Sequence, residues 1–149
     1  MKKIVLTIAT ILITGIGFSQ FKYKTINNDF DEEYRIVYNK DSYGTLMKME
    51  NIDGEVCLYL ENGIFCGKAL NVDVVFIMPN GTKSNYNLNC AVSDDSELLM
   101  LTDNLINSIM VDDFKKASKM KIRVNDSYCD DSYFEFSMVG STNALNFID

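Results

Sequence analysis

Short stretches in which apolar and polar residues alternate recur from residue 34 to the end of the chain. In one of them, Met120, Ile122 and Val124 alternate with Lys121 and Arg123. Because successive side chains of a β-strand point to opposite faces, this alternation predicts strands that bury one face. The stretches predicted as strands are residues 34–38, 45–50, 55–60, 64–66, 72–78, 84–90, 98–101, 120–124 and 134–138.

Turn dipeptides separate several of these stretches. Asp53-Gly54, Asn62-Gly63 and Asn80-Gly81 each lie between two predicted strands, and residues 41–44 read as a further turn. Both central positions of the favoured two-residue hairpin loop need positive φ, which Asn, Asp and Gly adopt readily. The three dipeptides therefore predict antiparallel hairpins. Residues 72–78 are apolar on both faces, which predicts a central strand of the sheet.

Two short segments near the C-terminus have the features of helices. In residues 112–118, acids come first and lysines follow, which suits the helix dipole. Ser141 is placed to cap a second short helix that runs through Ile148. Residues 20–33, which are polar and acidic, are predicted to be a loose lead-in. The chain is thus expected to be mainly β, an antiparallel β-sandwich of residues 20–149 whose short helices cover one open end.

The first residues have the pattern of a secretory signal peptide. Lys2 and Lys3 precede an uncharged, mostly apolar run at residues 4–18, and the small Ser19 favours cleavage after it. Cleavage after Gln20 is the alternative. A retained anchor is disfavoured because a span needs about 20 apolar residues. We therefore expect residues 1–19 to be a signal peptide and the mature chain to be periplasmic or secreted, without a stable membrane anchor.

The charge balance narrows the choice of partners. The chain has 14 Lys and Arg residues against 21 Asp and Glu residues, a formal net charge of −7. Removing a leader with two lysines and no acids would make it more negative still. Because an acidic surface repels phosphate backbones, we expect no nucleic-acid partner. A protein or a glycan partner is compatible with this charge.

Four cysteines remain in the mature chain: Cys57, Cys66, Cys90 and Cys129. An even number in an exported chain predicts at least one disulfide, and the three connectivities stay open. Buried free thiols are the alternative. Cys57 and Cys66 flank the Asn62-Gly63 turn, where a two-residue loop makes them diagonal neighbours, whereas a shift of one residue makes them opposite.

The sequence contains no histidine, which excludes Ser-His-Asp and Cys-His mechanisms and the usual zinc sites. It also lacks a Gly-rich phosphate loop and a GxSxG elbow. Carboxylates remain, as the adjacent pairs Asp94-Asp95, Asp112-Asp113 and Asp130-Asp131. Asp126 to Asp131 is either a solvated acidic loop or a calcium loop, although it lacks the EF-hand spacing. We assign no catalytic, cofactor or metal-binding residues.

The C-terminal half resembles a known family. The segment "DDFKKASKMKIRV" followed by "FEFSMVGSTNAL" looks like the end of the exported domain shared by invasion-associated locus B-type proteins and some type VI secretion accessory proteins. The present chain lacks the tryptophan that is frequent in such domains. The resemblance implies a β-sandwich with a binding or accessory role and no recognised catalytic residues.

These observations predict an exported accessory or binding module, not an enzyme, of bacterial or phage origin. Such a module should show a concave apolar or aromatic surface without converging carboxylates. A carboxylate-dependent secreted hydrolase is one alternative and needs two acids in one cleft with separated pKa values. A secreted inhibitor or phage-encoded interaction protein is another and needs a large exposed apolar patch. Four tyrosines could line a ligand surface or serve packing: Tyr23, Tyr43, Tyr86 and Tyr128.

Overall fold

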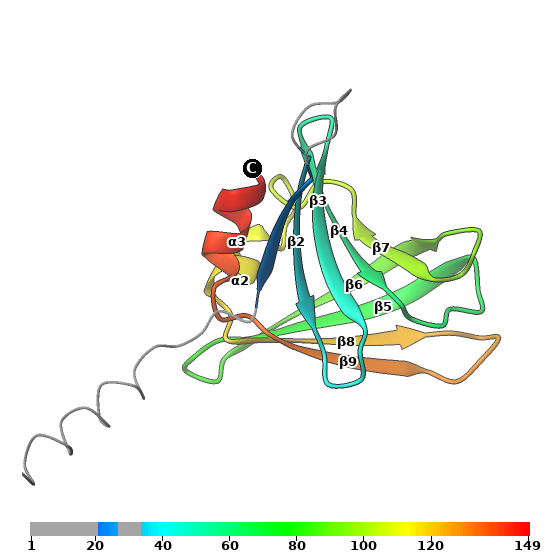
Figure 1. The fold of residues 1–149 in the computed structure, drawn as a ribbon. Helices are drawn as coiled ribbons and strands as arrows, with labels where there is room; N and C mark the ends of the chain where they lie inside the picture. Colours follow the sequence, from blue (N-terminus) through cyan, green and yellow to red (C-terminus); the bar gives the residue numbers. More distant parts are fainter. Residues whose placement is uncertain (1–20, 27–33) are drawn as a thin grey trace, which may run out of the picture.

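The computed structural model describes residues 21–26 and 34–149, which form one nine-stranded antiparallel sheet and two short helices (Figure 1). The strand order is β1-β2-β3-β4-β7-β6-β5-β8-β9. The strands are β1 (Lys22–Ile26), β2 (Tyr34–Lys40), β3 (Leu46–Ile52), β4 (Glu55–Glu61), β5 (Ala69–Ile77), β6 (Lys83–Val92), β7 (Leu98–Thr102), β8 (Lys119–Asn125) and β9 (Ser132–Ser137).

The sheet bends strongly, so that β1 to β4 cross over β6, β5, β8 and β9 (Figure 1). The register shifts between Leu58 and Tyr59 where β4 meets β7, and such irregularities let a sheet turn. The bend brings β2 to the far edge of the sheet, where Asn39 Nδ2 donates a hydrogen bond to the Ser137 carbonyl at 2.5 Å. The mainly-β antiparallel class is confirmed. In place of the two separate sheets of the expected sandwich, one folded sheet encloses the core.

The core lies on the inner face of this folded sheet. Val72, Val74 and Phe76 of β5 are buried there, while the residues between them are half-buried or exposed on the outer face. β5 pairs with β6 on one side and β8 on the other, which confirms it as a central strand. Its outer face therefore belongs to a continuous platform of strands.

The two helices cover one open end of the folded sheet (Figure 1). α2 (Val111–Lys116) buries Phe114, whose ring packs against the rings of Phe21 and Phe76. α3 (Ser141–Ile148) buries an apolar side made of Ala144, Leu145 and Ile148. Both helices and their docking are as the sequence predicts.

The expected cap of α3 is wrong. The N-cap residue is Gly140, at φ 92°, and no side chain caps the helix. The Ser141 hydroxyl instead donates to the Lys115 carbonyl at 3.4 Å and joins α3 to α2. A left-handed residue is needed for the sharp exit from β9, and glycine adopts that conformation without a Cβ clash.

The predicted loose lead-in is partly wrong, because residues 22–26 form β1 and pair with β2. The strand has no alternating apolar pattern, because its lysines are exposed. Phe21, just before the strand, is buried. Residues 27–33 of the predicted lead-in lie outside the described part of the chain. So do residues 1–20, which contain the predicted signal peptide. In the described ranges 21–26 and 34–149, no helix is long and apolar enough to cross a membrane.

The three turn dipeptides, each predicted to form a hairpin, adopt different structures. Asp53 and Gly54 both have positive φ and join β3 to β4 as a two-residue hairpin. Asn80-Gly81 lies in a wider turn, in which Met78 N–H donates to the Thr82 carbonyl at 2.8 Å. The structure overturns the third hairpin, because residues 64–66 are not a strand and β4 pairs with β7 instead.

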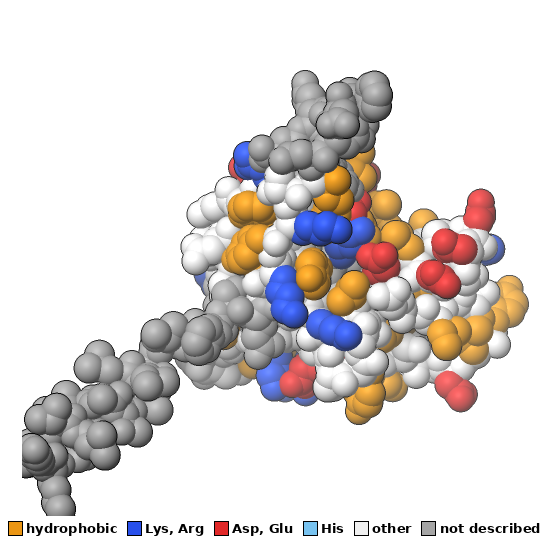
Figure 2. Space-filling model, in the orientation of Figure 1, with side chains coloured by type: hydrophobic (Ala, Val, Ile, Leu, Met, Phe, Trp, Pro, Cys, Tyr) orange, Lys and Arg blue, Asp and Glu red, His pale blue; other side chains and the backbone are white. Residues whose placement is uncertain are grey.

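Charge is unevenly spread over the face seen in Figure 2. Lys and Arg side chains gather over the region of β2 and β3 together with a few acidic ones, and further Asp and Glu side chains lie at the end opposite the helices. That end is built from the loops that connect β4 to β5, β6 to β7 and β8 to β9.

Candidate functional site

A groove of about 650 Å³ lies on the outer face of β6, β5, β8 and β9. The antiparallel register builds it, because residues directly opposite one another on four neighbouring strands form straight rows. Two such rows line the groove. The first row holds Asn87, Asp73, Arg123 and Tyr133, and the second holds Asn85, Val75, Lys121 and Glu135.

Apolar and aromatic groups line part of the groove. Val75 is half-buried in the middle of the second row. Tyr133 of β9 is 63 % exposed. Tyr43, 88 % exposed, and Ser42 reach the groove from the turn between β2 and β3, which the bend of the sheet brings near β9. Two exposed rings thus lie on a surface that also carries polar groups.

Asp41 holds the turn that presents Tyr43. Its Oδ1 accepts hydrogen bonds from the backbone N–H groups of Tyr43 and Thr45, both at 2.9 Å. Asp41 is buried, so these bonds replace its contacts with water. This is the side chain-to-backbone turn typical of aspartate, and Asp41 acts as a positioning residue for the tyrosine.

A hydrogen-bonded network ties the first row together. Asp73 Oδ2 accepts a bond from Arg123 Nε at 2.9 Å and from Asn125 Nδ2 at 3.2 Å, and its Oδ1 accepts one from Asn87 Nδ2 at 2.8 Å. Asn87 and Asn71 exchange a reciprocal pair of amide bonds at 2.8 Å. The Arg123 guanidinium is the main cause that lowers the pKa of Asp73 to about 2, with the two amides adding to it.

The other carboxylate of the groove is held in the same way. Glu135 lies between Lys119 and Lys121, with N···O distances of 2.5 and 3.0 Å. Hydrogen bonds from these two ammonium groups, first from Lys119, lower the pKa of Glu135. Both groove carboxylates are therefore ionised at neutral pH. A hydrolytic pair needs one acid whose pKa is raised, and neither acid of the groove has that property.

The four tyrosines singled out in the sequence lie in different places. Tyr43 and Tyr86 line the groove, and of these two Tyr43 is the exposed one. Tyr86 donates a hydrogen bond to Asp113 at 2.5 Å, and this bond is the main cause that raises the pKa of Tyr86 to about 12. The ring of Tyr23 packs edge-on against Phe147, and Tyr128 lies beside the disulfide described below.

Sequence reasoning missed most of the groove residues. A signal was present in β5, where Asn71 and Asp73 interrupt an otherwise apolar central strand. Polar residues on the outer face of a central strand pair with neighbours on both sides. Their partners, such as Arg123 and Tyr133, become apparent only when the register is known.

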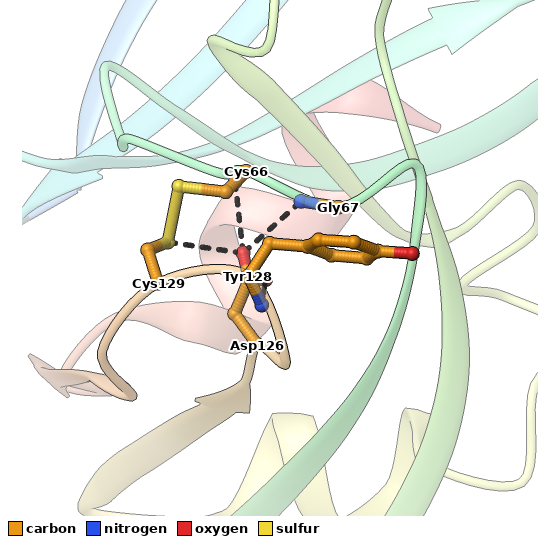
Figure 3. Close-up of a disulfide and its surroundings, with 5 residues drawn as sticks. All are labelled: Cys66, Gly67, Asp126, Tyr128 and Cys129. Carbon is orange, nitrogen blue, oxygen red and sulfur yellow. Dashed lines mark hydrogen bonds between the residues drawn. A yellow bond between two sulfur atoms is a disulfide. The ribbon is translucent and has the colours of Figure 1, made fainter.

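Cys66 and Cys129 form a disulfide with a Cα–Cα distance of 6.0 Å (Figure 3). The prediction of at least one disulfide is confirmed, and among the connectivities left open the structure joins Cys66 to Cys129 and leaves Cys57, across the Asn62-Gly63 turn, as a free thiol. Cys57 and Cys90 are buried free thiols, and burial raises the pKa of both, that of Cys90 to about 11. The native bond joins the loop after β4 to the loop after β8.

Asp126 forms a second link between the same two loops (Figure 3). Its Oδ2 accepts hydrogen bonds from the N–H groups of Cys66 at 2.8 Å and Gly67 at 3.2 Å, and its Oδ1 accepts one from Tyr128 N–H at 3.0 Å. Burial raises the pKa of Asp126, but the backbone donors outweigh burial, and the net pKa is lowered. The Cys129 sulfur lies 3.3 Å from Oδ2 and carries no proton in the disulfide.

The acidic residues considered in the sequence do not converge on the groove. The carboxylate of Asp126 is directed at N–H donors of its own and the facing loop, whereas Asp130 and Asp131 are exposed. Asp94-Asp95 lies in the loop between β6 and β7, and Asp112-Asp113 lies in the first turn of α2. Each pair therefore belongs to a different segment.

No family model, curated protein or solved structure matches this chain. The resemblance to invasion-associated locus B-type and type VI secretion accessory proteins accordingly stays a prediction.

Proposed function

We propose that the protein is an exported, non-catalytic binding module whose groove holds a glycan. The observation that carries this proposal is the pair of cross-strand rows, with the exposed rings of Tyr43 and Tyr133 beside ionised and amide side chains. Ligand sites of this kind combine apolar surface with a few fixed polar groups. The groove is partly aromatic, as expected of a binding module, but it differs from the expected surface in that two carboxylates, Asp73 and Glu135, line it.

A sugar ring fits the chemistry of these rows. Its C–H faces are apolar and can lie flat on a tyrosine ring, while its hydroxyl groups both donate and accept hydrogen bonds. Asn85 carries an exposed amide that can do the same, whereas the Nδ2 group of exposed Asn87 already donates to Asn71 and Asp73. Because Asp73 and Glu135 are neutralised by their own cations, the groove suits a polar ligand whose recognition does not depend on charge.

The pKa values favour binding over hydrolysis. Both groove carboxylates are shifted in the same direction, downward, by fixed cationic partners. A general acid would have to hold its proton near neutral pH, and these two groups lose theirs far below it. The carboxylate-dependent hydrolase is therefore the less favoured function.

The test is a screen of defined soluble oligosaccharides, followed by titration of the best ligand against variants. We expect Tyr133→Ala to raise the Kd at least about tenfold, since stacking on an aromatic ring is worth on the order of 1–3 kcal/mol per base in the analogous nucleic-acid case. Tyr128→Ala is the matched control, because Tyr128 is also a largely exposed tyrosine but lies outside the groove. Equal affinities of the two variants, or the absence of any oligosaccharide ligand, would disprove the proposal.

Export is part of the same proposal. A disulfide is typical of proteins in oxidising compartments, and the first 19 residues have the pattern of a signal peptide. We propose a periplasmic or secreted location after cleavage behind Ser19. Mass spectrometry of the exported protein should give a chain that begins at Gln20. An intact chain that begins at Met1 and is recovered from membranes would contradict export.

A further inference from the structure

Three loops meet at the end of the molecule opposite the helices, and we call residues 62–68, 93–97 and 126–131 the loop tip (Figure 1). The first and third loops are joined by the disulfide and by Asp126. The first and second are joined by a hydrogen bond from Phe65 N–H to the Ser96 carbonyl at 3.3 Å. Lys68 Nζ adds bonds to the carbonyls of Ser93 and Asp94 at 3.2 and 3.0 Å.

Two large apolar side chains project from this cross-linked frame into solvent. Ile64 is 83 % exposed and lies two residues before Cys66, while Tyr128 is 82 % exposed and directly precedes Cys129. The disulfide thus keeps both side chains in one neighbourhood. The Tyr128 ring extends past Gly67 (Figure 3). A Cβ atom added to Gly67 would lie 3.5 Å from Cδ2 of Tyr128.

Acidic residues lie in the same three loops as these two side chains. Figure 2 shows Asp and Glu side chains beside hydrophobic ones at this end of the molecule. Within the three loops the one basic residue is Lys68, and it pairs with Asp94. The exposed acids of the loop tip are Asp94, Asp95, Glu97, Asp130 and Asp131.

We propose that the loop tip is a docking surface for a cationic protein segment, whose apolar side chains would contact Ile64 and Tyr128 while its Lys or Arg residues face the acidic rim. An apolar centre with a charged rim is the usual arrangement of a protein interface. Complementary charge would speed the encounter and exclude acidic partners. A bilayer with anionic headgroups would be repelled by the same rim.

The cross-links make the tip suited to binding without rearrangement. A disulfide, a buried carboxylate and several backbone bonds already fix the three loops, so little conformational entropy remains to be lost on association. The groove, in contrast, lies on the outer face of the sheet and uses other residues. The two proposals are therefore independent, and either can fail alone.

Two synthetic peptides of equal charge provide the probe, one alternating Lys with Leu and the other alternating Lys with Ser. Titrated into the isotope-labelled mature protein, the Lys–Leu peptide should shift the NMR signals of residues 62–68, 93–97 and 126–131 before others. Its Kd should rise at least about tenfold in the double variant Ile64→Ser/Tyr128→Ser. Raising the NaCl concentration from about 50 to about 500 mM should strongly weaken binding of the Lys–Leu peptide to the native protein, because salt screens exposed charges.

Ile109→Ser is the matched control, since Ile109 is 80 % exposed and lies between β7 and α2, at the helical end. It should leave the Kd unchanged, and the Lys–Ser peptide should bind the native protein at least about tenfold more weakly than the Lys–Leu peptide. The proposal is overturned if the double variant binds the Lys–Leu peptide as tightly as the native protein does. It is equally overturned if the shifts fall in the groove or spread over all acidic surfaces.

Discussion

The two ends of the folded sheet are held by different interactions. At the helical end, α2 and α3 bury apolar side chains, with the Phe114 ring between those of Phe21 and Phe76. At the loop tip, the joints between residues 62–68 and 126–131 are one disulfide and one carboxylate with several backbone donors, while Phe65 adds one buried ring. Apolar burial depends on neither protons nor reductants, whereas both joints of the loop tip depend on one of them. Chemical conditions should therefore loosen one end and leave the other intact.

The largest effect should come from the helical end. Phe114→Ala removes a fully buried ring that contacts two others, and we expect a loss of about 3–5 kcal/mol in the free energy of unfolding. Urea unfolding measures this loss, and it should be the same with and without reductant. Exposed Ile109→Ser should change the value by less than about 0.5 kcal/mol. A loss that disappears on reduction would show that the ends are coupled.

Breaking the disulfide should have the next largest effect. The double variant Cys66→Ser/Cys129→Ser frees two residues that are 63 positions apart, and we expect a loss of about 2–4 kcal/mol. Reductant should lower the stability of the native protein by a similar amount and leave the double variant unchanged. The comparison of the two ends fails if reduction leaves the unfolding midpoint of the native protein where it was.

The smallest effect should come from Asp126 and should depend on pH. Asp126→Asn weakens three backbone hydrogen bonds to a charged acceptor. We expect a loss of about 1.5–3 kcal/mol in the free energy of unfolding near neutral pH. Because the folded-state pKa of Asp126 is lowered, its stabilising contribution is present above the unfolded pKa, about 3.9, and is lost as the pH falls through the folded value. Unfolding free energies of the two proteins from pH 7 down to about 2 should converge. A constant difference over that range would contradict the assignment.

Strands that bury a face could be predicted from the sequence, because burial leaves a local pattern of apolar residues. Alternation and apolar runs between turns located eight of the nine described strands, because most of these strands bury chiefly one face and β4 buries both. They missed β1, in which an edge position leaves Lys22 and Lys24 exposed. They also predicted a strand at residues 64–66, where Phe65 is buried by a loop and not by a ladder.

Long-range pairing was beyond reach of these local patterns. The turn at Asn62-Gly63 suggested that Cys66 neighbours Cys57, but β4 pairs with β7, and the intervening loop carries Cys66 to Cys129. The groove has the same origin, since Asp73 and Arg123 lie 50 residues apart and meet only through the register of β5 and β8. The sequence contained the residues of the site but no record of which strands are neighbours.

The disulfide also orders the events of biogenesis. If the protein is exported, as proposed above, it leaves the cytoplasm from its N-terminus, so Cys57, Cys66 and Cys90 would reach the oxidising side before Cys129. Any bond that forms among the first three is non-native and must be exchanged once Cys129 arrives. Burial of Cys57 in β4 and Cys90 in β6 withdraws two of the competing thiols as the sheet assembles. Folding of the sheet thus determines which two cysteines lie together, and oxidation then joins that pair.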